Sequence, residues 1–298
     1  MLRPVGDGET TTGRARGVVA RVDSVSDAPA RPGAPSAEVH PPPLTLAFDV
    51  GGTGLKAGVL DGRGEMTVER VRVATTYPMP PDRLVGTLRD LARQLPSADR
   101  VAVGFPGQVR RGRVLSAPHF VTTKGPGSRV DPALVAAWGN FDLAGALARA
   151  LRAPCRVAND ADVQGAAVIE GRGLEVALTL GTGVGSAFFM DGRMLPHMEF
   201  AQVPFRQGDT FNEQLGDAAR KRIGHAKWNR RVRRAIDYFD VLSAFDHLYL
   251  GGGNARHVRL DELGEVAARV STVENSEGIR GGLELWDDRH VGVRGDDG

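Results

Sequence analysis

Three glycine-rich turns and two aspartates carry residue types suited to phosphate chemistry. The turns read DVGGTG at 49–54, GTGVG at 181–185 and GGGN at 251–254. Each turn follows an apolar run typical of a buried strand, and ligands of α/β proteins bind at the carboxyl ends of such strands. Glycine lets backbone N–H groups approach a phosphate closely. One such turn is more often a plain hairpin, but three at matching places favour a phosphate site.

These turns belong to neither of the two common nucleotide-binding motifs. The chain contains no GxxxxGK[ST] string, which excludes a Walker loop. In a dinucleotide-binding turn the glycines open a helix, whereas the first two turns here are followed by another β-rich run. At the first turn, Asp49 could hold Mg²⁺ beside phosphate oxygens, and Thr53 offers a hydroxyl. Lys56 either neutralises phosphate charge or points to solvent.

The second aspartate, Asp160, is the last residue of a predicted strand at 155–160, and a predicted helix follows it. Phosphoryl transfer depends mainly on positioning and charge neutralisation, with one carboxylate oriented on the attacking hydroxyl. Asp160 could supply that carboxylate. Asn159 and Asp160 also make a good helix N-cap, and both roles are compatible because a cap fixes the position that catalysis needs.

The strands and helices that must position these residues repeat along the chain. A β-rich meander with a glycine turn is followed by alternating helices and strands, and the pattern restarts after residue 160. This order predicts an α/β protein of two sheet domains that face a central cleft. We expect a disordered, Pro-rich extension at 1–43, an N-terminal domain at 44–158 and a C-terminal domain at 159–275. A C-terminal helix that returns to the first domain, and then a tail, would occupy 276–298.

Composition limits the function classes. The net charge of +2 over 298 residues does not indicate a nucleic-acid partner. Cys155 is the single cysteine, so the chain has neither an internal disulfide framework nor a Cys-rich zinc segment. No apolar run is long enough for a membrane span or typical of a signal peptide. We therefore expect a cytoplasmic protein without a membrane partner.

The motifs resemble those of a known family in their order and approximate spacing. FDVGGTGLKAG, GFPGQV, ANDAD, LTLGTGVGSAFF and LGGGNA are similar to segments of ROK-type sugar kinases of the actin/hexokinase/Hsp70 superfamily, and among these to polyphosphate glucokinases. The resemblance covers roughly residues 44–285. It implies an actin-like (ribonuclease H-like) two-domain kinase with a central cleft. Such an enzyme would transfer a phosphoryl group from polyphosphate or ATP to a hexose hydroxyl, glucose or a related sugar, with Mg²⁺ and without zinc.

The same resemblance implies roles for individual residues. Asp160 would deprotonate the sugar hydroxyl, Asn159 would bind a hydroxyl, and Gly107 would lie in the sugar loop. Asp49 would contact the metal. The phosphate- and donor-binding set would be Asp49, Gly51, Gly52, Thr53, Gly54, Lys56, Gly181, Thr182, Gly183, Gly185, Gly251, Gly252, Gly253 and Asn254.

One segment departs from the family pattern. EFAQVP occupies 199–204, where polyphosphate glucokinases carry a segment resembling Glu-Leu-Gly-His-Leu-Glu. Glu199 is kept, but Ala201, Gln202 and Pro204 stand where glycine, histidine and the second glutamate would be. We expect Glu199 and Gln202 to contact the substrate in a rebuilt sugar pocket. The alternative is a catalytically weak sugar or phosphate sensor, whereas a transcriptional repressor would need a helix-turn-helix that the Pro-rich extension does not supply.

Two further segments could reach a substrate. The stretch at 119–138 either shapes the sugar entrance through Thr122, Thr123 and Lys124 or is a solvated loop. Residues 220–234 include eight Lys or Arg and no acid. A helix there would gather basic side chains that suit a polyphosphate chain or simply face solvent; these are Lys227, Arg230, Arg231 and Arg234. A homodimer is also possible.

Overall fold

The computed structural model describes residues 42–273 and 279–287 of the chain. Its first five-stranded sheet is built from β1 (Thr45–Val50), β2 (Gly54–Leu60), β3 (Val71–Ala74), β4 (Arg100–Phe105) and β8 (Cys155–Asn159). The strand order is β3-β2-β1-β4-β8. β1 pairs antiparallel with β2 and parallel with β4, which pairs parallel with β8. The carboxyl ends of β1, β4 and β8 therefore meet at one edge.

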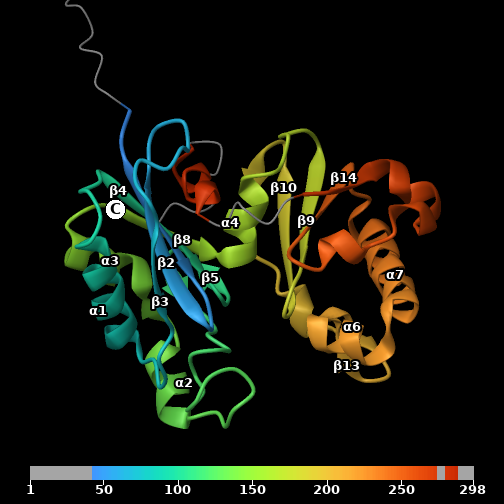
Figure 1. The fold of residues 1–298 in the computed structure, drawn as a ribbon, viewed down its shortest axis with the longest axis horizontal. Helices are drawn as coiled ribbons and strands as arrows, with labels where there is room; N and C mark the ends of the chain where they lie inside the picture. The colour runs from blue at the N-terminus through green and yellow to red at the C-terminus, as the bar shows by residue number, and fades with distance from the viewer. Residues whose placement is uncertain (1–41, 274–278, 288–298) are drawn as a thin grey trace, which may run out of the picture. The chain divides into compact units, whose positions relative to one another are not determined.

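Helices cover this sheet through apolar side chains at helical spacing. α1 (Pro81–Ala92) buries Leu84, Leu88 and Leu91, which are spaced by four and three residues and so share one face. α3 (Leu143–Leu151) lies beside it (Figure 1). The smaller elements here are α2 (Pro132–Trp138), β5 (Val109–Arg110), β6 (Arg113–Val114) and β7 (Phe141–Asp142). Ahead of β3, Met66 forms only an isolated bridge with Leu60.

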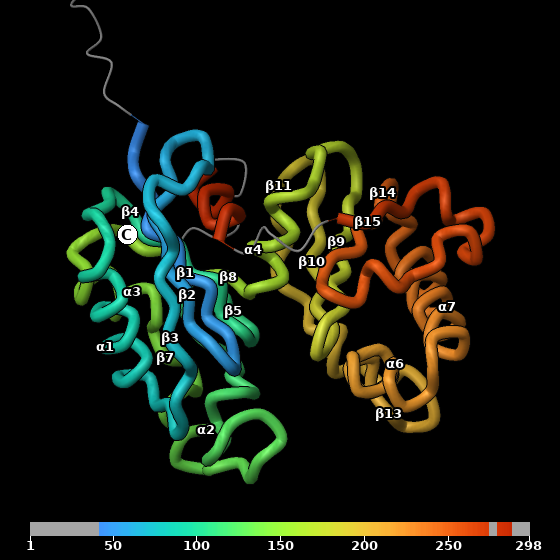
Figure 2. The backbone as a smooth tube through the Cα atoms, viewed as in Figure 1, coloured from blue at the N-terminus to red at the C-terminus, as the bar shows by residue number. Residues whose placement is uncertain are grey.

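A second five-stranded sheet repeats the topology of the first. It consists of β9 (Leu174–Leu180), β10 (Val184–Met190), β11 (Arg193–Met194), β14 (His247–Gly251) and β15 (Val270–Thr272). The order β11-β10-β9-β14-β15 again has an antiparallel meander of three strands and two strands parallel to its first member. Figure 2 shows the β9–β10 hairpin beside β14. The predicted repetition of two similar halves is therefore confirmed.

Helix α4 (Asp160–Ala166) contacts strands of both sheets. Its contacts with them are made mostly by small side chains in one buried cluster. A glycine sits on the inner side of α4, because a side chain at Gly165 would approach Ala177 and Phe189 to within 3 Å. The close approach that glycine and alanine allow holds this helix against both sheets. The cluster contains Ala102, Ala158, Val163, Ala166, Ala177, Ala187, Phe189, Met194 and Leu285.

The second sheet is covered by α5 (Phe211–Leu215), α6 (Asp217–Ile223) and α7 (His225–Ser243). α7 buries Trp228, Val232 and Ile236 against the sheet. A small ribbon of β12 (Pro204–Arg206) and β13 (Asp209–Thr210) precedes α5. Short 3₁₀ turns complete this half: η1 (Phe200–Gln202), η2 (Ala255–His257), η3 (Leu260–Glu262) and η4 (Gly264–Arg269).

The segment 119–138 is only in part the solvated loop that we weighed from the sequence: 126–127 and 129–130 are exposed, but other residues are packed. Phe120 and Trp138 are buried in the first core, and the indole N–H of Trp138 donates to the Met79 carbonyl at 2.9 Å. Thr122 is also buried, and its hydroxyl donates to the carbonyl of His119. The segment is fixed because its aromatic side chains complete the core beneath β4 and β5.

The predicted N-terminal extension and C-terminal helix are described only in part. Most of the predicted extension, residues 1–41, lies outside the described residues. Of the predicted C-terminal helix, residues 279–287 form two 3₁₀ turns, η5 (Arg280–Gly282) and η6 (Glu284–Trp286), which contact β1, β4 and β8. The domain boundaries stay a prediction. None of the helices in the described ranges has the length and apolar character that a membrane span requires.

Candidate active site

The first glycine turn joins β1 to β2 and is fixed through its carbonyl groups. The Thr75 hydroxyl donates to the Gly51 carbonyl, and the Tyr77 hydroxyl donates to the Gly52 carbonyl, both at 2.7 Å. Gly51 also closes the turn by donating its N–H to the carbonyl of Gly54 at 3.0 Å. Within the described residues the N–H groups of Gly52 and Thr53 have no such partner. The turn can therefore offer backbone donors to an anion.

Asp49 and Lys56 lie directly opposite each other at the base of this turn. The Lys56 ammonium is 2.6 Å from an Asp49 carboxylate oxygen, and both side chains are partly buried. Lys56 therefore points to the turn and not to solvent. Over residues 42–273 and 279–287, no three His, Cys, Asp or Glu side chains are placed to hold a metal by themselves. Mg²⁺ is commonly held by one or two carboxylates together with substrate phosphates, so Asp49 fits that more limited role.

The second glycine turn joins β9 to β10. The Gly181 N–H donates to the Gly183 carbonyl, and the Gly181 carbonyl accepts from the Asp217 N–H at 2.9 Å. Two glycines are required by close packing. A side chain at Gly183 would meet the Asn212 amide, and one at Gly185 would lie 2.8 Å from the Ala161 side chain. Gly185 therefore lets the second hairpin touch the first turn of α4, while Thr182 is exposed at the tip of the turn.

The third glycine turn follows β14 and packs directly on the second. Gly252 has φ +83° and lies so close to the Leu180 carbonyl that no side chain fits there. The Asn254 side-chain amide donates to the Gly181 carbonyl at 3.0 Å. Gly251 ends the strand and Gly253 is exposed. These bonds bring the second and third turns together as one surface.

Asn159 ties the start of α4 to the turn after β4. Its side-chain oxygen accepts from the Ala161 N–H at 2.7 Å, so it is the N-cap that the sequence pattern predicts. Its amide donates to the Gly107 carbonyl at 2.9 Å. Gly107 is itself pressed against the Ser116 carbonyl, where a side chain would clash. These bonds give Asn159 a positioning role, and a direct contact with a sugar stays a prediction.

Asp160 is the first residue of α4 and is partly buried. Desolvation and the nearby charge of Asp49 raise the pKa of Asp160 from 3.8 to about 7, although a hydrogen bond from the Ala161 N–H and the charge of His197 oppose the shift. A carboxylate with a pKa near neutrality can take a proton in catalysis. The influence of Asp49 also places the first glycine turn within electrostatic reach of Asp160.

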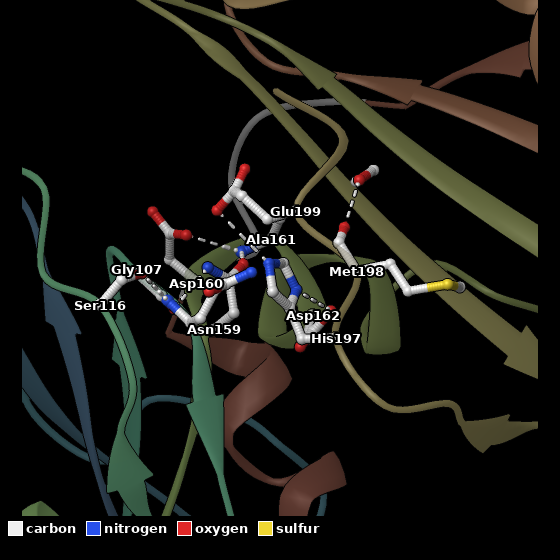
Figure 3. A network of polar contacts seen from close by, with 11 residues as sticks. Gly107, Ser116, Asn159, Asp160, Ala161, Asp162, His197, Met198 and Glu199 are labelled. Carbon is white, nitrogen blue, oxygen red and sulfur yellow. Dashed lines mark hydrogen bonds and ion pairs between the residues drawn. The ribbon is translucent and has the colours of Figure 1, made fainter. Parts of the chain in front are cut away.

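Two residues that the sequence analysis missed lie beside Asp160: Asp162 and His197 (Figure 3). The His197 Nδ1 lies 3.0 Å from an Asp162 carboxylate oxygen, and both side chains are almost completely buried. The His197 Nε2 is 3.6 Å from Glu199 and has no hydrogen-bond partner among the described residues. Burial alone would lower the pKa of His197, but Asp162 and Glu199 outweigh it and raise the pKa to about 9. Asp162 and Glu199 thus favour the charged form of His197, while burial raises the pKa of the Asp162 carboxyl itself.

The two predicted sugar contacts in EFAQVP have different surroundings. Glu199 is partly buried beside His197, and its charge also acts on the pKa of His119, which desolvation lowers. Gln202 is exposed, because the neighbouring Ala201 turns into the core within η1. The structure thus groups Glu199 with Asp160 through His197 and does not bring Gln202 to them.

Comparison with known proteins gives one family and several related kinases. The family model described as "ROK family" matches residues 45–198. A polyphosphate glucokinase of Mycobacterium tuberculosis is 26% identical over 220 residues, which cover 71% of this chain and 78% of the relative.

Solved structures have the same architecture. An inorganic polyphosphate/ATP-glucomannokinase from Arthrobacter sp. strain KM has a TM-score of 0.66 and 27% identity, and the match covers 81% of this chain and 97% of that one. A ROK family glucokinase from Streptomyces griseus, solved with glucose and AMPPNP, has a TM-score of 0.61 at 18% identity, covering 81% and 98%. The actin-like kinase fold predicted from the sequence is thereby confirmed.

Proposed function

Because the chain belongs to the ROK family, we propose that it is a sugar kinase that transfers a phosphoryl group from polyphosphate or ATP to a hexose hydroxyl. The observation that carries this proposal is Asp160, whose carboxylate has a pKa near neutrality and starts the helix that touches the second phosphate hairpin. The related proteins named as polyphosphate glucokinase and polyphosphate/ATP-glucomannokinase support the choice of glucose or a similar hexose.

In this proposal Asp160 accepts the proton of the attacking sugar hydroxyl. With a pKa of about 7, roughly half of the Asp160 carboxyls are ionised at pH 7, which suits a general base. The oxygen of the hydroxyl then attacks the terminal phosphorus of the donor, and the bond to the leaving phosphate breaks. Asn159 fixes the carboxylate by capping α4 and bonding to Gly107.

The donor phosphates are proposed to bind at the three glycine turns. N–H groups of Gly52 and Thr53 would face the transferred group, and the turns at 181–185 and 251–254 would hold the rest of the donor. Lys56 supplies a positive charge at the base of the first turn. Mg²⁺, held by Asp49 together with the donor phosphates, would neutralise charge that develops on the phosphoryl oxygens.

We propose that His197 supplies a further contact to the sugar. Its Nε2 is buried and accepts or donates no hydrogen bond in the described part of the chain, where Glu199 is 3.6 Å away; its Nδ1 faces Asp162. A buried N–H that lacks a partner costs free energy, and a sugar hydroxyl would satisfy it. Its positive charge also favours the ionised form of Asp160.

The basic face of α7 remains a candidate path for polyphosphate. Arg234 lies over the ring of Tyr238 and donates to its hydroxyl, so part of this charge is already in use. Arg231 is different: its Nη1 is buried without a hydrogen-bond partner in the described ranges, and desolvation together with the charges of Arg206 and Arg222 lowers its pKa. Lys227 and Arg230 are exposed. A homodimer also stays a prediction.

A second candidate function is a catalytically weak sugar or phosphate sensor. The observation that favours it concerns Gln202 and Pro204, which stand where polyphosphate glucokinases have a histidine and a glutamate. Both residues are exposed. Loss of these contacts would reduce orientation of the sugar without removing the phosphate turns.

A coupled kinase assay separates the two functions. The protein would be tested with polyphosphate and with ATP against glucose, mannose and N-acetylated hexoses, with product identification by mass spectrometry. Turnover that Asp160→Asn abolishes would exclude the sensor. Binding of sugar and donor by calorimetry without any phosphorylated product would exclude the kinase.

A further inference from the structure

The second and third glycine turns adjoin a group of basic side chains that the proposed reaction does not use. The Gly181 carbonyl accepts two hydrogen bonds. One comes from the N–H of Asp217, the first residue of α6, and the other from the side chain of Asn254, the residue before η2. Arg220 and Lys221 extend from α6, while Arg256 and His257 extend from η2. Both elements are therefore anchored on the turn that would hold donor phosphate.

These basic side chains contact one another. The Arg220 Nη1 lies 3.3 Å from His225 Nε2, and the Arg256 Nε lies 3.4 Å from His257 Nε2. The two imidazole rings meet edge to face, with centroids 4.9 Å apart. We call Arg220, His225, Arg256 and His257 the turn-side cluster. Its members come from three elements, α6, α7 and η2.

The charge of this cluster is only partly compensated. Asp217 pairs with Arg220 at 2.8 Å and with Lys221 at 2.6 Å, so one carboxylate serves two cations. Arg256 is exposed and forms no ion pair among the described residues. Desolvation and the charges of Arg220, Arg256 and His225 lower the pKa of His257, against the effect of Asp217. An anion placed here would relieve the repulsion.

The space beside two glycines of these turns is open. A side chain projected from Gly181 or from Gly253 would meet no other atom within 4 Å. An elongated ligand that starts at the second turn can therefore continue past Gly253 to Arg256 and His257. Dense linear polyanions bind fixed positive charge strongly because they release condensed counterions.

We infer that the turn-side cluster binds the distal part of an inorganic polyphosphate chain, whose end to be transferred lies at the glycine turns. The inference rests on the proposed kinase function and names the path of its longer donor. The chain leaves the second turn between Asp217 and Asn254 and crosses Arg220, His225, Arg256 and His257. This path differs from the basic face of α7 formed by Lys227, Arg230 and Arg234.

Binding of phosphate chains of two lengths tests the path without requiring turnover. The variant Arg220→Gln/Arg256→Gln removes two guanidinium groups from the cluster, and Arg89→Gln/Arg93→Gln removes two from the exposed face of α1 as a matched control. We expect the cluster variant to bind long-chain polyphosphate about tenfold more weakly at low salt, and the slope of log affinity against log salt to fall by about 1.4. The control variant should match the wild type, and affinity for tripolyphosphate should change less than about threefold in either variant.

Because Arg220 is largely buried against Asp217, two further measurements keep the test independent of folding. Arg256→Gln alone, at an exposed position, should show about half of the change in salt slope. In the wild type, ring signals of His225 and His257 should shift when long-chain polyphosphate is added, while the signal of His247 on β14 should not.

Three results would overturn the inference. They are equal loss of tripolyphosphate and long-chain binding, an unchanged affinity of the cluster variant, and a loss found only in Arg230→Gln/Arg234→Gln. Each can occur in a protein that phosphorylates a sugar with ATP, so they reject the path and leave the kinase standing. A protein without turnover that still shows the length-dependent loss would reject the kinase and keep the polyphosphate surface.

Discussion

The pKa of Asp160 gives a quantitative prediction for the pH dependence of turnover. With a pKa of about 7, Asp160 is ionised in about 9% of molecules at pH 6 and about 91% at pH 8. A carboxyl at its ordinary pKa of 3.8 would be ionised almost completely at both values. If Asp160 is the general base, kcat/KM for the sugar should therefore rise about tenfold from pH 6 to pH 8.

His197 adds a second limb to the same profile. Its pKa of about 9 means that it loses its positive charge above that pH, so kcat/KM should fall again on the alkaline side. His197→Gln should remove the alkaline limb. It should also move the acidic limb upward, because the His197 charge lowers the pKa of Asp160.

The assay is kcat/KM for the sugar from pH 5.5 to pH 9.5 at saturating donor and Mg²⁺, with a coupling system that is not rate-limiting at any pH. His247→Gln is the matched control, because His247 is a partly buried histidine on β14 that bonds to Ser271. It should leave both limbs in place. A flat profile between pH 6 and pH 8, or a downward shift of the acidic limb in His197→Gln, would refute the assignment of Asp160 and His197.

Three other predictions follow from the site. Asp160→Asn should stabilise the fold more at pH 8 than at pH 5, by about 1–2 kcal/mol in thermal unfolding. The reason is that a carboxyl with a raised folded pKa contributes less to the free energy of unfolding as the pH rises towards that pKa. An equal effect of the substitution at both pH values would contradict the raised pKa. His197→Gln should raise KM for the sugar at least about tenfold with little change in KM for the donor, and a loss in kcat alone would argue against a sugar contact. Gly185→Ala should lower kcat, because the new side chain would meet Ala161 and displace the start of α4. Gly86→Ala on α1 is the control, since a side chain there has free space and should leave kcat unchanged. Equal kcat values for the two variants would show that α4 tolerates the shift.

The glycine turns and the fold were predictable because their signals are local. A turn between two β-rich runs fixes a hairpin, and the register then follows from the length of the turn. Asp49 pairs with Lys56 in this way, so counting back from the turn would have decided the direction of Lys56. The repeat of the meander in the second half made the two-sheet architecture readable from the order of elements.

The Asp162–His197 pair was missed because nothing local specifies it. The two residues are 35 positions apart, and His197 lies in a segment between β11 and η1 that has no regular secondary structure. No periodicity therefore sets the direction of its side chain. One signal was present: Asp162 follows Ala161 on the buried side of α4, and a buried carboxylate needs a partner. A search for that partner would have led to the histidines of the chain.

The packing of the segment 119–138 was not predicted for a related reason. Its Gly, Pro, Ser and Thr content is typical of a loop, and such composition does not tell whether the loop is packed. Phe120 and Trp138 decide the matter, because their large apolar areas are buried with Phe105 in one aromatic cluster. Gln202 was assigned by its place in a motif; the 3₁₀ turn points Ala201 inward and leaves Gln202 exposed, so its contact with a substrate stays a prediction.

The repeated topology also suits the proposed function, in which one site holds two different substrates. The turn between β1 and β2 and the turn between β9 and β10 are equivalent in the two sheets, and both are proposed to hold phosphate. The turns after β4 and after β14 are likewise equivalent, but Gly107 is bonded to Asn159 beside Asp160, whereas Gly251–Gly253 lie beside Arg256 and His257. The turn after β4 thus lies beside a carboxylate, that of Asp160 after β8, whereas the turn after β14 lies beside basic groups. In the proposed reaction a sugar hydroxyl needs the base and a phosphate chain needs the cations, so we propose the acceptor beside the ends of β4 and β8 and the donor at the end of β14.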